Sequence, residues 1–264
     1  MRFSMSSVFG GAFSILGKAF VPLLIVTVGL YLAPYLVLNG LLQVTTGINL
    51  ATPQAWQGSL FPVTLVASLG MWFLMLMHIS AVTEIAVLKS VDKAIDLKSV
   101  VLHAAGNALP LLGIYILCAL GWFLTALLLL IPAFIFAVVF SVVVPAYVAE
   151  KPGFFGAFAR SRDLTRGHRW GIFGMWLLIM IVFYLIIGAV EFPIMMPILK
   201  QSMEGAARGT PPVQPDLPLL SMVVITVVGN VLSVIMLVLN ASFYAALRGE
   251  KEKYSGPSVE KVFE

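Results

Sequence analysis

Charged residues are scarce in this chain, since Asp, Glu, Lys and Arg together make up 11% of its 264 residues. A typical globular domain holds about 25% charged residues. Apolar residues make up 60% of the chain, and the mean hydropathy is +1.02. A soluble fold of this size cannot bury that much apolar surface. The composition therefore excludes an ordinary soluble enzyme, a nucleic-acid-binding domain and a disordered chain, and it predicts that the surrounding solvent is lipid.

The chain also lacks the residues that most often carry chemistry. Its one cysteine, Cys118, excludes an intrachain disulfide. Its three histidines, His78, His103 and His168, lie in three different regions and show no metal-ligand spacing. There is no phosphate-binding Walker loop and no HExxH, GxSxG or CxxC motif. We therefore predict no catalytic residue, no metal and no cofactor.

Long apolar runs are what the chain has instead. A membrane-spanning helix needs about 20 mostly apolar residues. Six stretches fit this requirement, namely residues 19–42, 61–80, 109–130, 133–148, 170–190 and 217–239. The second is expected to continue as a helix to about Ser90. The third and fourth meet at Ile131-Pro132, which predicts the turn of a tight helical hairpin, and Pro145 should kink the fourth.

The basic residues are distributed asymmetrically along the chain. The N-terminus, residues 84–103, residues 150–169 and the C-terminal tail hold 2, 3, 5 and 4 basic residues, which is 14 of the 16. The other predicted face holds Lys200 and Arg208 alone. The positive-inside rule then places both termini in the cytoplasm, as six spans require. We predict an all-α, six-span protein of a bacterial inner membrane.

Three amphipathic segments begin near residues 5, 95 and 153, and two spans follow each of them. In the first, Phe9, Phe13 and Leu16 recur at helical spacing. Such segments suit the membrane surface. We therefore predict three cytoplasmic surface helices and a triplicated unit of surface helix, span and span. The predicted ranges are 5–90, 95–150 and 153–247 for the three units, 1–247 for a single membrane domain and 248–264 for a cytoplasmic tail.

The strongest local feature is a basic run that precedes the fifth span. It contains Arg160, Arg162, Arg166, His168 and Arg169. Arginine forms planar, bidentate pairs with phosphate oxygens, so the run predicts a site for phospholipid head groups. Alternatively, these residues only hold the loop in the cytoplasm, with Trp170 as an anchor at the membrane interface.

Three further ionisable residues are candidate polar partners of this run. Glu84 and Glu150 follow the second and fourth spans on the same predicted face. They could pair with the arginines, or they could be charges at helix ends in water. His78 lies deeper in the second span, where an ionisable group is a functional candidate. A histidine near a helix end can instead snorkel or bind a backbone carbonyl.

Three short segments carry a family resemblance. They are residues 142–150 (VVVPAYVAE), 156–161 (GAFARS) and 164–170 (LTRGHRW). Together they resemble the bacterial family called the glycerophosphoryl diester phosphodiesterase membrane domain, and related integral membrane proteins. The resemblance is specific over residues 131–170 and implies a six-helix membrane module without established catalytic residues. Because only residues 248–264 follow the last span, we do not expect the phosphodiesterase activity itself.

The leading hypothesis is a non-enzymatic membrane module. It would bind or organise phospholipid, or a membrane partner protein, through its basic interfacial helix, and it would not bind nucleic acid. A small transporter or lipid-translocating protein is the first alternative, because repeated helix pairs are common in transporters. The second alternative is an intramembrane enzyme that acts on phospholipid through His78, Glu84 and the arginines.

Overall fold

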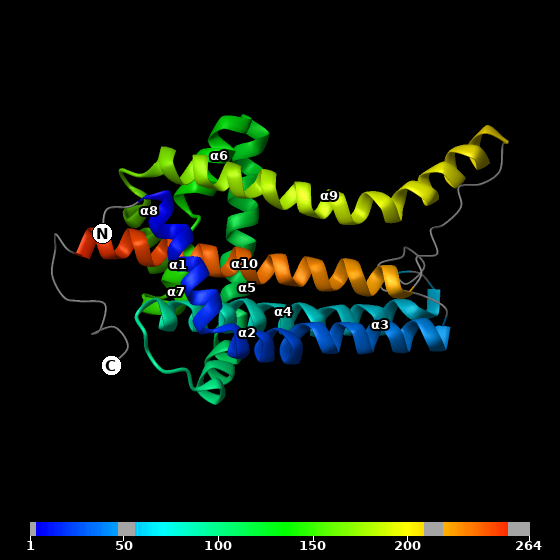
Figure 1. Cartoon of the computed structure of the whole chain (residues 1–264), viewed down its shortest axis with the longest axis horizontal. Coiled ribbons are helices and arrows are strands. Elements are labelled where there is room, and N and C mark those ends of the chain that lie inside the picture. Colours follow the sequence, from blue (N-terminus) through cyan, green and yellow to red (C-terminus); the bar gives the residue numbers. More distant parts are fainter. Residues whose placement is uncertain (1–3, 47–55, 57, 209–218, 253–264) are drawn as a thin grey trace. The chain divides into compact units, whose positions relative to one another are not determined.

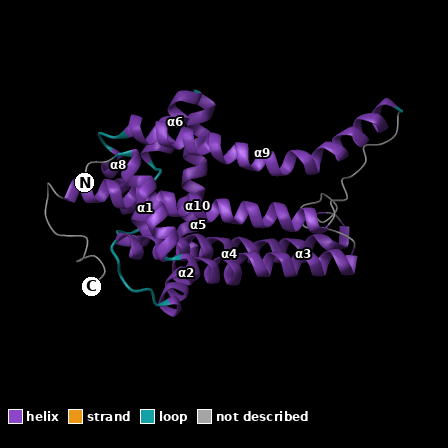
Figure 2. Cartoon of the chain, viewed as in Figure 1, coloured by secondary structure: helices purple, strands orange, loops and turns teal. Residues whose placement is uncertain are grey.

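The structure is a computed structural model that describes residues 4–46, 56, 58–208 and 219–252. Within these residues it contains helices and loops and no β-strand (Figure 2). The prediction of an all-α protein is confirmed. In chain order the helices are α1 (Met5–Lys18), α2 (Phe20–Thr27), the π-helical turn η1 (Val28–Leu32), α3 (Ala33–Thr46), the 3₁₀ turn η3 (Gly58–Leu60), α4 (Phe61–Ser90), α5 (Leu97–Leu128), α6 (Leu130–Val139), α7 (Val143–Glu150), α8 (Phe154–Thr165), α9 (Arg169–Ala207) and α10 (Leu219–Glu252).

Six helical stretches are long and apolar enough to cross a membrane. They are Phe20–Thr46, Gly58–Ser90, Leu97–Leu128, Ile131–Glu150, Arg169–Ala207 and Leu220–Glu252. The six predicted spans are confirmed on these grounds, and the second continues to Ser90 as expected. Five of the six bury only 11–22% of their most apolar residues, so most of their apolar surface is available to lipid.

The chain forms two compact units. The first comprises Met1–Phe173 and Val234–Glu264, and the second comprises Gly174–Ser233. Helices α9 and α10 run from one unit into the other. All the sites discussed below lie within the first unit.

Helix α4 forms the centre of the first unit. Its side chains from Leu76 to Thr83 and from Ile85 to Val87 are buried. Helices α1, α2, α3, α5 and α7 all contact it. In Figure 1, α5 runs across the direction of α4 rather than alongside it. His78, Ser80 and Thr83 of α4 are therefore enclosed by protein.

Helices α5 and α6 form the predicted hairpin. Its turn is at Leu129, which has an extended backbone, and not at Ile131-Pro132. Pro132 instead lies in the first turn of α6, where a missing backbone N–H costs no hydrogen bond. A Cβ atom at Gly121 would lie 2.2 Å from Phe136, so glycine allows α5 and α6 to approach closely.

Two of the three predicted surface segments are separate helices. These are α1, which ends at Lys18 before α2, and α8. The second segment differs, because it forms the first turns of the continuous helix α5. Residues 104–108 contain Gly106 but no proline, and Pro110 is accommodated within the helix. The order of surface helix, span and span is therefore clear at the two ends of the chain and merged in its middle.

The fourth span is interrupted near Pro145, as predicted. Helix α6 ends at Val139 and α7 begins at Val143. The amide of Val143 donates to Phe140 O at 3.2 Å, which leaves the Val139 carbonyl without its usual helical donor. The hydroxyl of Ser161 in α8 donates to that carbonyl at 2.9 Å. The break in the fourth span thus fixes the position of α8.

Candidate functional site

Helix α8 contains the first two arginines of the basic run, Arg160 and Arg162, and the rest of the run follows in the turn to α9. Its buried side consists of Ala157, Ser161, Leu164 and Thr165. The hydroxyl of Thr165 donates to the same Val139 carbonyl as Ser161, at 3.3 Å. Because these hydrogen bonds hold the buried side of α8 against the break between α6 and α7, the opposite side of α8 faces outward.

Arg160 is held by two carboxylates. Its Nε lies 2.8 and 2.9 Å from the two oxygens of Glu150, and its Nη2 lies 3.0 Å from Glu252 Oε1. Glu150 is the last residue of α7, and Glu252 is the last residue of α10. Of the candidate polar partners, Glu150 is thus the one that meets the basic run. The guanidinium of Arg160 is committed to protein.

A second arginine completes this network from α10. The side chain of Arg248 is only 3% exposed, and its Nε lies 2.7 Å from Glu252 Oε1. Its Nη1 donates to the hydroxyl oxygen of Tyr244 at 3.1 Å, and that hydroxyl donates to Glu150 Oε1 at 2.7 Å. Two arginines and two glutamates therefore balance their charges at the junction of α7, α8 and α10. We name Glu150, Arg160, Tyr244, Arg248 and Glu252 the charge network.

Two further contacts connect the same end of α10 to α8 and the turn after it. Lys251 Nζ lies 2.9 Å from Asp163 Oδ1 and also donates to the Asp163 carbonyl. His168 Nε2 lies 3.6 Å from a carboxylate oxygen of Glu250. The last turn of α10 is thereby fixed to the helix that carries the basic run.

The α10 half of this network was not predicted from the sequence. Arg248 and Glu252 are four residues apart, which is a common spacing for ion pairs on a helix. Arg248 also follows directly on a long apolar run, where an unpaired charge would be costly. These two signals together indicate a paired Arg248 on α10, but they do not connect it to the basic run.

The three remaining arginines of the run are exposed. Arg162, Arg166 and Arg169 form no ion pair or side-chain hydrogen bond within the part of the chain that the structure describes. Next to them, the side chains of Trp170 and Phe155 are 87% and 76% exposed. Three guanidinium groups and two large aromatic side chains therefore face outward together.

A groove opens beside these residues. It has a volume of about 490 Å³. Its lining is Ile131, Phe134, Ile135, Val138, Arg169, Trp170 and Phe173. Six of these seven side chains are apolar, and Arg169 is the single charged group. The groove thus combines an apolar channel with a guanidinium, which is an arrangement that fits an acyl chain next to a phosphate. We name it the α6–α9 groove.

His78 and Glu84 make contacts elsewhere. His78 is buried, its Nε2 lies 3.2 Å from the Thr27 hydroxyl, and its ring stacks on Tyr31 at 5.8 Å. Glu84 Oε1 lies 2.8 Å from His103 Nδ1. These residues therefore do not converge with the arginines on one polar cavity. Their contacts connect α4 to α2 and to α5, as hydrogen bonds between membrane helices do.

No candidate metal centre is present among the described residues. Three or more His, Cys, Asp or Glu side chains do not come together anywhere in residues 4–46, 58–208 and 219–252. The chemistry available at the exposed part of the basic run is therefore that of guanidinium groups and apolar side chains. Such groups bind anions and lipid chains by charge and by contact.

Comparison with known proteins gives one match. The model of a family described as a domain of unknown function (DUF7847) matches residues 58–247, which is well over half of the chain. Neither a curated protein nor a solved structure matches the chain. The match includes α4 to α9 and nearly all of α10, so the α6–α9 groove lies entirely within the family's domain.

Proposed function

The chain belongs to the DUF7847 family. From the arrangement of its side chains, we propose that the protein is a non-enzymatic membrane module that binds anionic phospholipid at the α6–α9 groove. The observation that carries this proposal is an apolar groove lined by the exposed Arg169, the last of three exposed arginines of the basic run, in a chain that has six candidate spans. The phosphate would lie against Arg162, Arg166 and Arg169.

Charge and geometry both favour a phosphate ligand. A guanidinium presents its N–H donors as a planar fork that matches two phosphate oxygens. Each basic residue near an anionic membrane surface adds about 1 kcal/mol of attraction. Arg160 would contribute little, because Glu150 and Glu252 already compensate its charge. The proposal therefore rests on three arginines of the run and not on all four.

The groove supplies a place for the acyl chain. Phe134, Ile135 and Phe173 give it an apolar wall, and Trp170 stands at its edge beside Arg169. Tryptophan is enriched at membrane interfaces because its ring is amphipathic. A lipid bound here would thus have its phosphate at the interface and one chain along α6.

The cytoplasmic face of a bacterial inner membrane is the location that this proposal requires. Fourteen of the 16 basic residues lie on the proposed cytoplasmic side, together with both termini. The resemblance to the glycerophosphoryl diester phosphodiesterase membrane domain supports a module of the same kind, and it stays a proposal. Anionic lipid in the cytoplasmic leaflet would then be the partner of the basic face.

Arginine-to-lysine variants separate lipid recognition from mere anchoring. Lysine keeps the positive charge and loses the planar fork. We expect the triple variant Arg162→Lys, Arg166→Lys and Arg169→Lys to insert normally, because the charge that fixes topology is preserved. We expect it to retain several-fold less anionic lipid than the unchanged chain. Native mass spectrometry of the purified protein measures this retention directly.

Two controls define the outcome of this experiment. Arg208→Lys changes an exposed arginine outside the first unit and should leave lipid retention unchanged. Trp170→Ala keeps every charge and removes one side of the groove, so it should lower retention as well. If the triple lysine variant and the matching triple alanine variant both retain as much anionic lipid as the unchanged chain, the basic run is an anchor and the proposal is wrong.

A further inference from the structure

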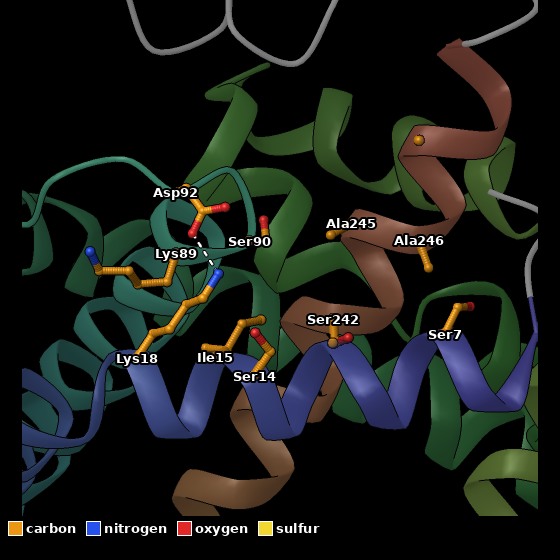
Figure 3. A pocket seen from close by; sticks show the side chains of 12 residues that line it. Ser7, Ser14, Ile15, Lys18, Lys89, Ser90, Asp92, Ser242, Ala245 and Ala246 are labelled. Atoms are coloured by element: carbon orange, nitrogen blue, oxygen red, sulfur yellow. Dashed lines mark hydrogen bonds and ion pairs between the residues drawn. The ribbon is translucent and has the colours of Figure 1, made fainter.

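A second cavity lies in the first unit at the junction of α1, the end of α4 and the last part of α10 (Figure 3). Its volume is about 300 Å³, which is within the usual range for small-molecule sites. Three elements line it. Helix α1 contributes Ser7, Gly11, Ser14, Ile15 and Lys18, and α10 contributes Ser242, Ala245, Ala246 and Gly249. The end of α4 and the following turn contribute Lys89, Ser90 and Asp92. We name it the α1–α10 cavity.

Small residues keep this cavity open. A Cβ atom at Gly11 would lie 2.6 Å from Ser242 Oγ, so α1 and α10 touch at that point. The Ser242 hydroxyl donates to the Val8 carbonyl at 2.7 Å and fixes this crossing. Beyond it, Ala245, Ala246 and Gly249 present almost no side chain, so the two helices leave a space between them.

The charged groups of the cavity are two ammonium groups and one carboxylate. Lys18 Nζ lies 2.7 Å from Asp92 Oδ1, and Figure 3 shows the side chain of Lys89 running away from this pair. The hydrogen bond from Lys18 holds the pKa of Asp92 below its usual range, so the carboxylate stays charged at neutral pH. The side chain of Lys89 has no ion-pair partner within the described residues. A ligand that replaces the Lys18–Asp92 ion pair must therefore supply one charge of each sign.

We propose that the α1–α10 cavity binds a zwitterionic phosphoethanolamine group. A simple anion would meet the carboxylate of Asp92, and a simple cation would meet the two lysines. A phosphate joined to a primary ammonium by a short linker satisfies both: its phosphate replaces Asp92 as the partner of Lys18, with the flexible Lys89 turning toward it, and its ammonium replaces Lys18 as the partner of Asp92. The Ser14 hydroxyl can accept a further N–H from the ammonium, because it is oriented into the cavity (Figure 3).

This site is distinct from the α6–α9 groove in both position and selectivity. The groove presents only positive charge to its ligand, whereas the cavity presents both signs. Its α1 wall also precedes residue 58, where the match to the family's domain begins. The phosphoethanolamine group could belong to a membrane lipid or to a free metabolite, and the two sources share this chemistry.

Titration calorimetry on the full chain, purified in a maltoside detergent, tests the proposal. The probes are free phosphoethanolamine and a short-chain phosphatidylethanolamine, with phosphocholine and inorganic phosphate for comparison. Phosphocholine has no N–H to donate to Asp92, and inorganic phosphate has no ammonium. We expect both to bind about tenfold more weakly than the matching phosphoethanolamine probe. Tight binding of the lipid alone would assign the head group of a lipid, and equal binding of the free compound would assign a soluble ligand.

Three variants locate the binding in the cavity. Asp92→Asn and Lys89→Gln each remove one charge from a side chain that is not buried and should each weaken binding by about tenfold. Gly249→Leu fills the cavity, since no atom lies within 4 Å of a Cβ atom at this position. Its control is Gly10→Leu, on the exposed side of α1, where the surroundings are equally open and the cavity is not reached.

The outcomes are unambiguous because the two sites are measured separately. Unchanged anionic-lipid retention shows that a variant is folded, and the charge variants remain informative if Gly249→Leu fails to fold. The proposal is overturned if neither phosphoethanolamine probe binds. It is equally overturned if binding is the same in the Asp92→Asn and Lys89→Gln variants as in the unchanged chain.

Discussion

At the scale of single residues, the guanidinium of Arg248 has the most demanding environment. It follows the apolar part of α10 and is buried, so its charge needs partners within the protein. Glu252 at 2.7 Å, Tyr244 at 3.1 Å and Glu150 at 3.8 Å supply them. Removing the arginine would leave two glutamates with one compensating charge, from Arg160.

We expect Arg248→Met to destabilise the protein by about 3–5 kcal/mol, because breaking a buried ion pair leaves an uncompensated charge. Unfolding by denaturant in detergent measures this change. The matched control is Arg162→Met on exposed α8, which should change stability by no more than about 0.5 kcal/mol. Equal effects of the two substitutions would show that the charge network contributes nothing specific.

At the scale of the elements, the start of α5 depends on one aspartate. Asp96 Oδ1 accepts from the Lys98 amide at 3.1 Å, and its Oδ2 accepts from the Ser99 hydroxyl at 2.6 Å. Asp96 is therefore the N-cap of a helix that continues for 32 residues. These hydrogen bonds, that of Ser99 foremost, lower the pKa of Asp96.

The cap should accordingly depend on pH in one direction. Because the pKa of Asp96 is lower in the folded protein, its contribution to stability is present above the pKa of the unfolded chain. This contribution is lost as the pH falls through the pKa that Asp96 has in the folded protein, which lies below about 4. Below this pH, we expect the backbone amides near Val100 to exchange hydrogen faster in the unchanged chain than the same amides do in the Asp96→Asn variant. Asparagine caps a helix as well as aspartate and does not titrate.

Hydrogen exchange of these amides, expressed as the ratio of the unchanged chain to the Asp96→Asn variant, measures the effect. Using the ratio removes the intrinsic dependence of exchange on pH. Asp96→Ala should expose the same amides at every pH. A ratio that stays constant as the pH falls would contradict the proposed role of Asp96.

The elements themselves were largely predictable from the sequence. Length and hydropathy predicted the six spans, and Pro145 predicted the break between α6 and α7. Length and hydropathy did not predict that the turn lies at Leu129, or that the second surface segment and the third span form one continuous helix, α5. A proline is tolerated in the first turn of a helix, so Pro132 gives the position of the turn only approximately. Residues 97–128 are amphipathic at first and then uniformly apolar, and both patterns are compatible with one helix.

The candidate site was predictable in part. The basic run and the neighbouring Trp170 stand out because charges are rare in this chain. The division of the run into a paired Arg160 and three exposed arginines depends on contacts with α7 and α10. Glu252 is 92 residues from Arg160 along the chain, and no local pattern connects them. The α1–α10 cavity depends likewise on Gly11 and Ser242, which are brought together only by folding.

At the scale of the whole molecule, apolar surface is exposed on nearly every span. The hairpin of α5 and α6 is the extreme case, because residues 109–148 contain no charge and Leu129 at its turn is 68% exposed. Only lipid can cover such a surface. In six spans with cytoplasmic termini, this turn would reach the outer face. The crossing of α5 over α4 in Figure 1 makes the hairpin the part of the topology that most needs a direct test.

Single cysteines in a Cys118→Ser background provide that test. We expect Ser59→Cys and Leu129→Cys to react with a membrane-impermeant thiol reagent that is added outside the cell, and Ser99→Cys to react only after the membrane is opened. The reason is the distribution of 14 basic residues against two, which predicts that the loop containing Ser99 lies in the cytoplasm. Reaction of Ser99→Cys from outside would reverse the orientation. If Ser59→Cys reacts and Leu129→Cys does not react on either side, the turn lies within the hydrocarbon, and the chain has four complete spans and one buried hairpin.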